Sequence, residues 1–571
     1  CLIYFIFISS FLIRSYRIEN NTYIIWDEGH FLKFAKYYLN RKFFFDVHPP
    51  LGKLFIAFLG YLFNMDTNYI YKASFDFPQD MDYLSIRNIH AFISSFVPVI
   101  IYLTLKEIYS INISFITSLA LVFDHSFILL SKMIIIDVYL YIFLTLSIYF
   151  FVLYSKYQKF IHLLSTGISL GLLLSVKWTG LFTIIHLGVY FLYEIYNMLK
   201  FSFKDACKKL YHYVFCLLLI PIIIYITSFY IHFLILNNPS DELIKMDSAF
   251  QRMYSMKNKE FIQYGDIINI KHKNLSGGLM HMYTAPKRFV SLSFGYNKHE
   301  DFILQSFKPK KFVESDEFVM IYNLTSQNYL CVDKNVLSRK KFNKSCVFKI
   351  KTREKKESVV YNDTSVSFLN LKSNCYLSVS NKTILEQRII ECSNKKEYFT
   401  IEDSTKREKS SLNPSFFSLF LELNKRMFLI NQSFILDADL NPKYFTSTPK
   451  EWLFLNKKIY FKPKNKYKFA FSVNKVIWYF ASSFIIFLPF KAFFTKSKKM
   501  FFVYFFYLGW IINYLPYFFM KRVMYFHHYL PAYMYSVLLL AHSFQNIKSL
   551  QFIILLGAVY FIYTSQYLYG Y

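Results

Sequence analysis

Long apolar runs separated by short polar connections occupy both ends of the chain. A helix that crosses a bilayer needs roughly 20 predominantly apolar residues. Runs close to this length lie near residues 1–16, 86–105, 111–130, 133–154, 160–175, 178–196, 212–236, 473–493, 500–520, 523–543 and 550–569. The pattern therefore predicts a polytopic α-helical membrane protein with about 11 transmembrane helices.

Two polar segments interrupt these runs. The first, residues 17–85, contains an apolar piece at 51–63 that is too short to cross a bilayer easily, and we expect this piece to lie along the membrane interface. The second covers residues 237–472. The chain is thereby divided into an N-terminal transmembrane region, 1–236, and a C-terminal transmembrane region, 473–571.

Basic residues in the connections orient the predicted bundle. Lysine is frequent at 155–160, 197–212 and 491–499, and loops rich in Lys and Arg stay on the cytosolic side. Both polar segments then lie on the opposite side, which is the lumen in a eukaryotic cell. The pair Lys521–Arg522 is a luminal exception that needs another explanation.

A weak internal repeat lies inside the second polar segment. The sequence VMIYNLTSQNYLCV at 319–332 aligns with VSFLNLKSNCYLSV at 366–379, and a looser copy lies at 268–282. Three copies with short alternating apolar runs predict an all-β, β-trefoil-like domain over residues 255–405, followed by a connector at 406–472. Chance similarity in a chain rich in Lys, Asn, Ile, Phe and Tyr is the alternative.

Four of the seven cysteines lie in this repeat region. Four cysteines allow three pairings. Spacings of 15 and 17 residues favour the bridges Cys331–Cys346 and Cys375–Cys392, one for each repeat, since an oxidising lumen permits disulfides. Free buried thiols are the alternative.

Composition excludes two broad classes of protein. With 54% hydrophobic residues and a mean hydropathy of +0.26, the chain is too apolar for an ordinary soluble protein. The net charge of +29 does not indicate nucleic-acid binding, because the Lys and Arg residues lie in short loops between apolar runs. No cleavable signal is visible, and the chain opens at Cys1 inside an apolar run, so we expect the natural N-terminus to lie upstream.

Two adjacent carboxylates, Asp27 and Glu28, follow the first apolar run. A single acid there is usually a solvated boundary residue, but this pair precedes an aromatic segment and the sequence DVHPP at 46–50. Ionisable groups near membrane depth cost free energy and are therefore functional candidates. Others near the predicted luminal helix ends are Arg87, Asp124, Lys132, Asp137, Lys177, Arg522, His527 and His528. Such a gathering of acids and bases predicts a site for a charged group on a lipid.

These motifs resemble the protein O-mannosyltransferase family. The similarity lies in WDEGHF at 26–31, FFDVHPPL at 44–51, LSVKWTGLF at 174–182, SLFLELNKRM at 418–427, STPKEW at 447–452 and LPYFFMKRVMYFHHYLPA at 515–532. The three-copy block is similar to the MIR repeats of that family. The resemblance therefore extends over nearly the whole chain, in order.

The resemblance implies a GT-C type glycosyltransferase of the endoplasmic reticulum membrane. Such an enzyme moves mannose from dolichyl phosphate β-mannose to Ser or Thr hydroxyls of secretory polypeptides, with inversion at the sugar carbon. It also implies a dimer with a related mannosyltransferase. No tight acidic cluster demands a metal, so we expect a metal-independent reaction with no cofactor besides the lipid-linked donor.

The resemblance also implies roles for particular residues. Asp27 is the candidate base that takes the proton of the acceptor hydroxyl, and Glu28 is expected to orient the acceptor or a cationic partner. Arg87 matches an arginine of the family and is expected to stabilise the charge on the leaving phosphate. A second cationic cluster at the luminal face consists of Arg522, His527 and His528.

Several of these candidates have structural alternatives. Lys177 either contacts the lipid phosphate or anchors the chain at the interface, and Asp46 and His48 either contact substrate or hold the loop by hydrogen bonds. His281 alone keeps an imidazole where MIR repeats carry histidine, and it is the candidate ligand contact of that domain. Gly29 stands where the family carries a branched residue, which predicts a more mobile loop. Residues His527 and His528 could instead cap a helix and pack against aromatic rings.

Three other functions stay open at this point. A transferase of another lipid-phosphate sugar would use the same chemistry, although the MIR-like block favours a protein acceptor. A non-catalytic partner subunit is a further alternative, but the presence of Asp27, Glu28 and Arg87 weighs against it. A transporter predicts inverted repeats and broken helices near the membrane centre, and neither is clear in the sequence.

Overall fold

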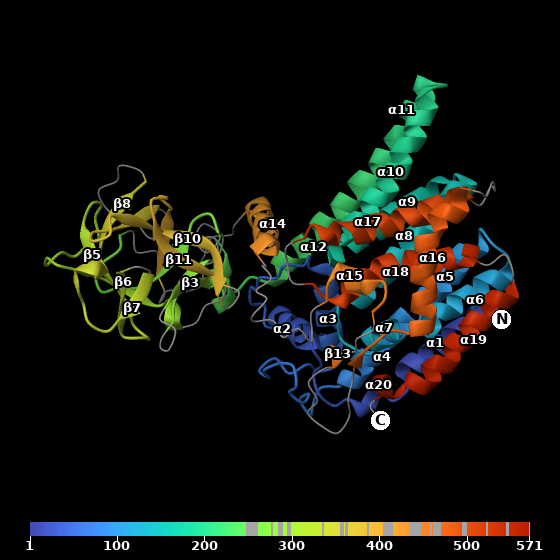
Figure 1. Cartoon of the computed structure of the whole chain (residues 1–571), viewed down its shortest axis with the longest axis horizontal. Coiled ribbons are helices and arrows are strands. Elements are labelled where there is room, and N and C mark those ends of the chain that lie inside the picture. Colours follow the sequence, from blue (N-terminus) through green and yellow to red (C-terminus); the bar gives the residue numbers. More distant parts are fainter. Residues whose placement is uncertain are drawn as a thin grey trace.

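The computed structural model describes residues 1–246, 250, 261–275, 278–283, 289–293, 298–333, 336–353, 359, 364–384, 387–403, 415–433, 447–455, 459–460, 470–493, 500–520, 524–543 and 547–569. Figure 1 shows a bundle of helices that contains both chain ends and a domain of strands beside it. The helix α14 (Phe416–Ser433) lies between these two parts and packs against α12 (Ile220–Ile235).

In each apolar run expected to cross the membrane, most of the residues that the structure describes are helical. The remaining helices that correspond to these runs are α1 (Leu2–Ser15), α4 (Tyr83–Ser94), α5 (Phe96–Lys106), α6 (Ile111–Val122), α7 (His125–Ser131), α8 (Asp137–Tyr157), α9 (Phe160–Val176), α10 (Gly180–Leu199), α11 (Phe203–Val214), α16 (Lys475–Phe493), α17 (Met500–Tyr514), α18 (Leu530–Ser543) and α19 (Ile547–Thr564). The helix α18 packs against α6, α16 and α17 and is buried almost throughout, which explains why it is apolar on all sides.

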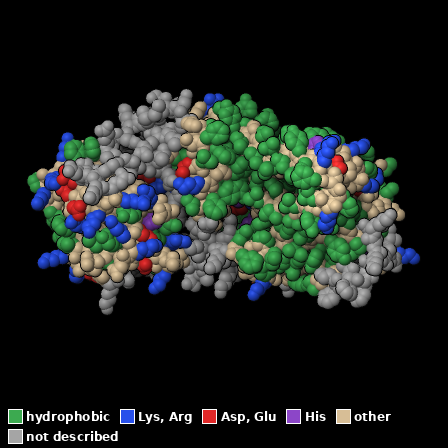
Figure 2. Space-filling view, turned by 90° about the horizontal axis from the view of Figure 1, so that it is seen from above, with side chains coloured by type: hydrophobic (Ala, Val, Ile, Leu, Met, Phe, Trp, Pro, Cys, Tyr) green, Lys and Arg blue, Asp and Glu red, His purple; other side chains and the backbone are tan. Residues whose placement is uncertain are grey.

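Length and composition show which described helices could cross a membrane. Four stretches qualify, namely Tyr83–Lys106, Asp137–Tyr157, Phe203–Ile235 and Met500–Phe518, and α6 with α7 makes a fifth if the bent pair is one span. Several other apolar helices are shorter than a full span. On the face shown in Figure 2, hydrophobic side chains cover most of the helical part, whereas charged side chains are spread over the strand domain and the outer end of the helical part. The exterior of the helical part is therefore suited to a lipid environment.

The bend between α6 and α7 is a broken helix that the sequence analysis did not find. The two helices meet at 60°, and Asp124 caps the second of them. Its Oδ1 accepts hydrogen bonds from the backbone N–H groups of Ser126 and Phe127, and its Oδ2 accepts one from the Tyr533 hydroxyl. Since an N-cap residue has non-helical backbone angles, this aspartate ends one helix and starts the next inside the bundle.

The first polar segment contains two helices, α2 (Glu28–Leu39) and α3 (Leu51–Leu62). Helix α3 is the apolar piece expected at the interface, and its length of about 18 Å is less than the thickness of a bilayer core. Helix α2 was not predicted, although Phe31, Ala35 and Tyr38 repeat at helical spacing and are buried. The short elements α15 (Pro449–Trp452), α20 (Gln566–Tyr569), β13 (Ile459–Tyr460) and β14 (Ala470–Phe471) complete the helical part.

Within the second polar segment, the described residues between 267 and 403 form a 12-stranded antiparallel sheet with its own hydrophobic core. Its strands are β1 (Ile267–His272), β2 (Leu279–Met282), β3 (Val290–Ser293), β4 (Phe302–Ser306), β5 (Phe318–Asn323), β6 (Asn328–Val332), β7 (Val336–Arg339), β8 (Val347–Thr352), β9 (Val366–Asn370), β10 (Cys375–Ile384), β11 (Gln387–Ser393) and β12 (Phe399–Asp403). The first strand pairs with the last, with Ile270 opposite Ile401, so the ends of the domain meet.

Three similar hairpins within this sheet coincide with the three sequence copies. The strands β1, β5 and β9 end at His272, Asn323 and Asn370. In each case the side chain of that last residue accepts a hydrogen bond from the backbone N–H three positions later, at 2.8–3.0 Å. The two predicted disulfides, Cys331–Cys346 and Cys375–Cys392, are confirmed. The repeat is therefore structural and not an accident of composition.

Candidate active site

The adjacent residues Asp27 and Glu28 have different surroundings at the start of α2. Trp26 has a left-handed backbone with φ of 45° and turns the chain into the helix. Neighbouring side chains on a helix point about 100° apart. Glu28 therefore points into the protein, where its side chain is 0% exposed, while Asp27 stays half-buried at the surface of the loop.

The Glu28 carboxylate is saturated by hydrogen bonds. Its Oε1 accepts from the Arg87 Nε at 3.0 Å and from the backbone N–H of Ile134 at 2.9 Å. Its Oε2 accepts from the backbone N–H of Ile25 and from the Arg87 Nη2, both at 2.7 Å. A carboxylate held by four donors in the interior is fixed in place and has no lone pair directed at a substrate.

Arg87, at the start of α4, is the partner that holds Glu28. It is 0% exposed, and its Nη1 and Nη2 also donate to the backbone carbonyls of Asn21 at 2.5 Å and Tyr23 at 3.2 Å. The guanidinium lies over the Phe77 ring at 4.9 Å. The expectation that Arg87 contacts the leaving phosphate does not fit this geometry, because the guanidinium is enclosed and occupied by the first loop.

The Asp27 carboxylate, in contrast, accepts no hydrogen bond from any residue that the structure describes. Burial raises the pKa of Asp27 to about 7; the Lys177 ammonium works against this shift, and the carboxylates of Asp137 and Asp46 add to it. Asp27 thus belongs to the same electrostatic cluster as these three residues. A carboxyl with such a pKa changes its protonation state near neutral pH.

The Asp46–His48 corner is held by Lys53, a residue that the sequence analysis missed. The Lys53 Nζ lies 2.5 Å from the Asp46 Oδ2 and donates to the His48 carbonyl at 2.6 Å, and Lys53 is only 2% exposed. Burial opposes ionisation of Asp46, but the Lys53 ammonium, together with His48 and the backbone N–H of Val47, outweighs burial and lowers the pKa of that carboxyl. The signal was a lysine inside the apolar run of α3, which requires an anionic partner.

The His48 ring remains neutral at this corner. Burial lowers the pKa of His48 to about 3, although the Asp46 carboxylate opposes the shift. Lys177, in the break between α9 and α10, contacts both carboxylate oxygens of Asp137 at 3.0 and 3.2 Å. The corner therefore combines a neutral imidazole with two buried ion pairs.

A cavity of about 550 Å³ brings three of the predicted residues together, one from each of three distant segments. It is lined by Val47, His48, Lys177, Trp178, Thr179, Leu181, Phe182, Phe428, Asn431, Tyr517, Phe519, Met520, Met524 and His528. Most of the lining is apolar, and the polar groups converge from the first loop, the α9–α10 break and the segment before α18. Such a cavity can accept a molecule with a polar head and an apolar tail.

The segment before α18 closes against the first loop. The His527 ring lies 5.0 Å from the Trp26 ring, and the Tyr525 ring lies 5.9 Å from it. The His528 Nδ1 accepts a hydrogen bond from the Tyr525 backbone N–H at 3.0 Å, so a neutral His528 carries its proton on Nε2. Arg522 lies outside the described residues. Among the described residues, no group of three His, Cys, Asp or Glu side chains could hold a metal ion.

Gly29 has a packing role in α2 instead of the expected mobility. A side chain at this position would begin 3.0 Å from the backbone nitrogen of Ala73. The missing side chain therefore allows the chain at Lys72 and Ala73 to pack directly on the first turn of α2. This close approach makes the start of α2 more fixed, not less.

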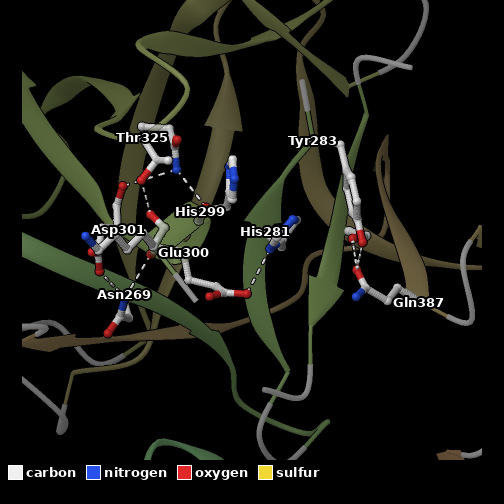
Figure 3. Close-up of polar contacts among 11 residues, drawn as sticks. Asn269, His281, Tyr283, His299, Glu300, Asp301, Thr325 and Gln387 are labelled. Carbon is white, nitrogen blue, oxygen red and sulfur yellow. Dashed lines mark hydrogen bonds and ion pairs between the residues drawn. The ribbon is translucent and has the colours of Figure 1, made fainter. Parts of the chain in front are cut away.

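His281 lies in the strand domain, away from this cluster. Its Nδ1 is 2.8 Å from the Glu300 Oε1, and both residues are buried, with exposures of 5% and 0%. Figure 3 shows the two side chains directed at each other, with the His299 ring beside them. The expected ligand contact is replaced by an internal pair.

The repeat explains why this pair exists. His281 lies between the core residues Met280 and Met282, as Cys331 lies between two core residues of β6. Glu300 precedes the buried Phe302 by two positions, as Cys346 precedes the buried Phe348. The His281–Glu300 pair therefore occupies the place of the Cys331–Cys346 disulfide and joins the same two elements of its own repeat.

The double substitution His281→Cys with Glu300→Cys is expected to form a third disulfide. Glu300→Ala alone should destabilise the strand domain by about 3 kcal/mol, because it removes the carboxylate that contacts the buried His281 ring. The formation of the bridge is measured by mass spectrometry of the non-reduced full chain, and stability by the temperature at which protease cuts residues 261–403. Two free thiols in the folded double variant would contradict the equivalence of the two positions.

Comparisons with known proteins agree with one another. The family model for dolichyl-phosphate-mannose-protein mannosyltransferase matches residues 4–237, and that for the C-terminal four transmembrane region of protein-O-mannosyltransferase matches residues 416–571. Dolichyl-phosphate-mannose–protein mannosyltransferase 2 of Candida albicans is 24% identical over 95% of this chain and 82% of its own length. Protein O-mannosyl-transferase 2 of Danio rerio is 27% identical over 96% of this chain and 85% of its own.

A solved structure has the same fold over the whole chain. The Saccharomyces cerevisiae protein O-mannosyltransferase Pmt1–Pmt2 complex, bound to the sugar donor, superposes with a TM-score of 0.79 at 22% identity, covering 100% of this chain and 90% of the other. At this level of identity the agreement concerns the fold, including the placement of the strand domain between two helical regions in the sequence.

Proposed function

This chain belongs to the protein O-mannosyltransferase family, a family of multi-pass membrane proteins, and we propose that Asp27 is the base of its transfer reaction. The activity is that of a dolichyl-phosphate-mannose–protein mannosyltransferase, which carries out protein O-mannosylation. This transfer requires a base for the acceptor hydroxyl, a site for the donor phosphate and room for the lipid chain, and residues of this chain supply each of them.

The contrast between the two adjacent carboxylates carries the proposal. Glu28 is occupied by four donors, whereas Asp27 is half-buried and accepts no hydrogen bond from the described residues. Asp27 accepts the proton of a Ser or Thr hydroxyl while the oxygen attacks the sugar carbon. The bond from that carbon to the lipid phosphate breaks on the opposite face, which gives inversion without a covalent sugar–enzyme intermediate.

The donor phosphate lies in the cavity that His48, Lys177 and His528 share. Lys177 supplies positive charge, and the Nε2–H of His528 supplies a hydrogen bond to the phosphate oxygen that gains charge as the bond breaks. The apolar residues of the same cavity, such as Leu181 and Phe182, accept the first part of the lipid chain. Glu28 and Arg87 act as positioning residues that fix the first loop, and Arg522 and His527 remain candidates for the phosphate site.

The surroundings of the enzyme are part of the proposal. The chain lies in the endoplasmic reticulum membrane with about 11 spans, and the first loop and the strand domain face the lumen. The strand domain is a β-trefoil of MIR type at residues 255–405, followed by the connector at 406–472. The chain pairs with a related mannosyltransferase, which is supported by the assembly of the yeast Pmt1–Pmt2 complex.

Mannose transfer in membranes tests the proposal directly. Membranes that contain this chain, with and without a related partner chain, receive dolichyl phosphate mannose and a peptide with one threonine, and the mannosylated peptide is quantified. Transfer that depends on this chain supports the enzyme. If transfer with the partner present is unchanged by Asp27→Asn, the chain acts as a non-catalytic subunit or uses another base.

The rate of transfer is expected to rise with pH through neutrality. A general base works only when it is ionised, and the pKa of Asp27 is raised to about 7, so most Asp27 is protonated below that pH. The value of kcat/KM should therefore fall about tenfold per pH unit below pH 6 and level off above pH 8. Asp27→Glu, which keeps an ionisable group, should move the midpoint. A flat profile from pH 5.5 to pH 8.5 in the wild type would contradict the assignment.

A further inference from the structure

A second cavity, of about 450 Å³, lies along α2 and shares no lining residue with the cavity described above. It is formed by the second half of α2, the loop near residue 70 and the chain just after α12. The lining residues are Lys33, Lys36, Tyr37, Asn40, Lys42, Tyr69, Ile70, Tyr71, Pro239, Ser240 and Asp241. We refer to it as the lysine pocket.

The lysine pocket has more hydrogen-bond donors than the protein uses. An ammonium group carries three N–H donors. Lys33 donates to the Glu242 Oε1 at 2.8 Å, and Lys36 donates to the carbonyls of Asn68 and Tyr69 at 3.1 and 2.9 Å. The exposed Lys42 side chain has no partner among the residues that the structure describes. The lining contains three lysines and one carboxylate, that of Asp241, and Lys33 is paired with Glu242 just outside the lining.

Aromatic walls give the pocket its shape. The Tyr69 and Tyr71 hydroxyls donate to the backbone carbonyls of Asp76 and Asp66, at 2.6 and 2.8 Å. Burial and the carboxylates of Glu242 and Asp241 raise the pKa of Tyr37 to about 12, so this hydroxyl keeps its proton. Ile70 and Pro239 are the two apolar aliphatic residues in the lining. The tyrosine rings and the lysine side chains therefore form a pocket that fits a small anionic group.

The exposed face of α2 connects the lysine pocket to Asp27. His30, Lys33 and Tyr37 follow Asp27 at spacings of three or four residues and lie on one stripe that is not buried. With a rise of 1.5 Å per residue, Lys33 to Tyr37 lie about 9–15 Å along the helix from Asp27. An extended polypeptide advances about 3.4 Å per residue, so this distance corresponds to roughly three to five residues.

We propose that the lysine pocket binds an Asp or Glu side chain of the acceptor polypeptide, about three to five residues from the hydroxyl at Asp27. This inference rests on the proposed function, since it assumes that the acceptor hydroxyl lies at Asp27. The carboxylate receives hydrogen bonds from Lys36 and Lys42 and from the Tyr37 hydroxyl. The enzyme thereby favours Ser and Thr residues in acidic stretches.

Matched peptides test the lysine pocket. Two threonine peptides carry Glu or Gln four residues from the acceptor, on either side of it, and are compared by kcat/KM in membranes that contain the full chain and its partner. The variant Lys36→Gln with Lys42→Gln removes two charges and keeps the length of both side chains. Lys308→Gln, on the exposed surface of the strand domain, is the matched control.

We expect the wild type and Lys308→Gln to prefer the Glu peptide on the order of tenfold, and the double variant to lose the preference. Equal kcat/KM for the two peptides in the wild type, or a preference that persists in the double variant, overturns the inference. The inference is also overturned if the double variant loses kcat/KM equally for both peptides and added vesicles of anionic phospholipid change that loss. Such a result would mean that the pocket binds the membrane. If neither peptide receives mannose in a reaction that depends on Asp27, the proposed function itself is contradicted.

Discussion

Asp27→Asn is expected to lower kcat for mannose transfer by about 10²–10⁴-fold, the range typical of a lost general base. The amide has nearly the shape of the carboxyl but cannot accept the acceptor proton. The carboxylate of Asp27 makes no hydrogen bond to the described residues, so the substitution breaks no hydrogen bond within that part of the chain. The variant should therefore keep the thermal stability and the expression level of the wild type.

The result depends on the contrast with the neighbouring acid. Asp27→Glu should retain part of the activity, since the base is kept and displaced by about one methylene length, about 1.5 Å. Glu28→Gln should lower stability, because it disrupts the four hydrogen bonds of a buried carboxylate. If Asp27→Asn retains most of its kcat, or if it loses activity only in proportion to lost folded protein, the base is another residue.

Arg87→Met is expected to destabilise the helical part by about 3–5 kcal/mol, the range for a buried ion pair broken on one side. Glu28 would then be a buried carboxylate whose charged partner is missing, at 0% exposure. The first loop would also lose the contacts from Arg87 to the carbonyls of Asn21 and Tyr23. Activity should fall with stability, because the loop that carries Asp27 is no longer fixed.

A double substitution separates positioning from direct chemistry. Glu28→Gln combined with Arg87→Met removes both charges, and the coupling energy of the cycle measures their interaction. If Arg87 acts through Glu28, the double variant should recover stability relative to Arg87→Met and regain part of the transfer rate. A double variant that folds as the wild type does but has no transfer activity would restore the expectation of a direct phosphate contact. Thermal unfolding in detergent and the peptide assay supply the two measurements.

The elements of this protein follow closely from its sequence. Apolar runs of nearly membrane length became helices, because a backbone in lipid must satisfy its own hydrogen bonds. The repeat at 319–332 and 366–379 predicted equivalent hairpins, because similar residues occupy the equivalent positions of each hairpin. The cysteine spacing favoured the two disulfides for the same reason. Helix α2 was missed because its polar stripe of lysines obscured the buried residues at helical spacing.

The candidate site followed from the sequence only in part. Asp27, His48, Lys177 and His528 were identified from motifs, and the fold brings the last three to one cavity. Lys53 was missed although it holds the Asp46–His48 corner. His281 was predicted to contact a ligand because a sequence motif gives the residue type but not the side chains around it. In the fold, the His281 ring contacts the buried carboxylate of Glu300.

By itself, the sequence determined the class of the molecule: the apolar runs, the repeats, the basic loops and the motifs that indicate a family. Only the tertiary structure decided which of two adjacent carboxylates is available for chemistry. The physical reason is that a carboxylate is occupied or available according to the donors around it. The donors that occupy Glu28 include Arg87 and the backbone N–H of Ile134, which are 59 and 106 residues away in the chain.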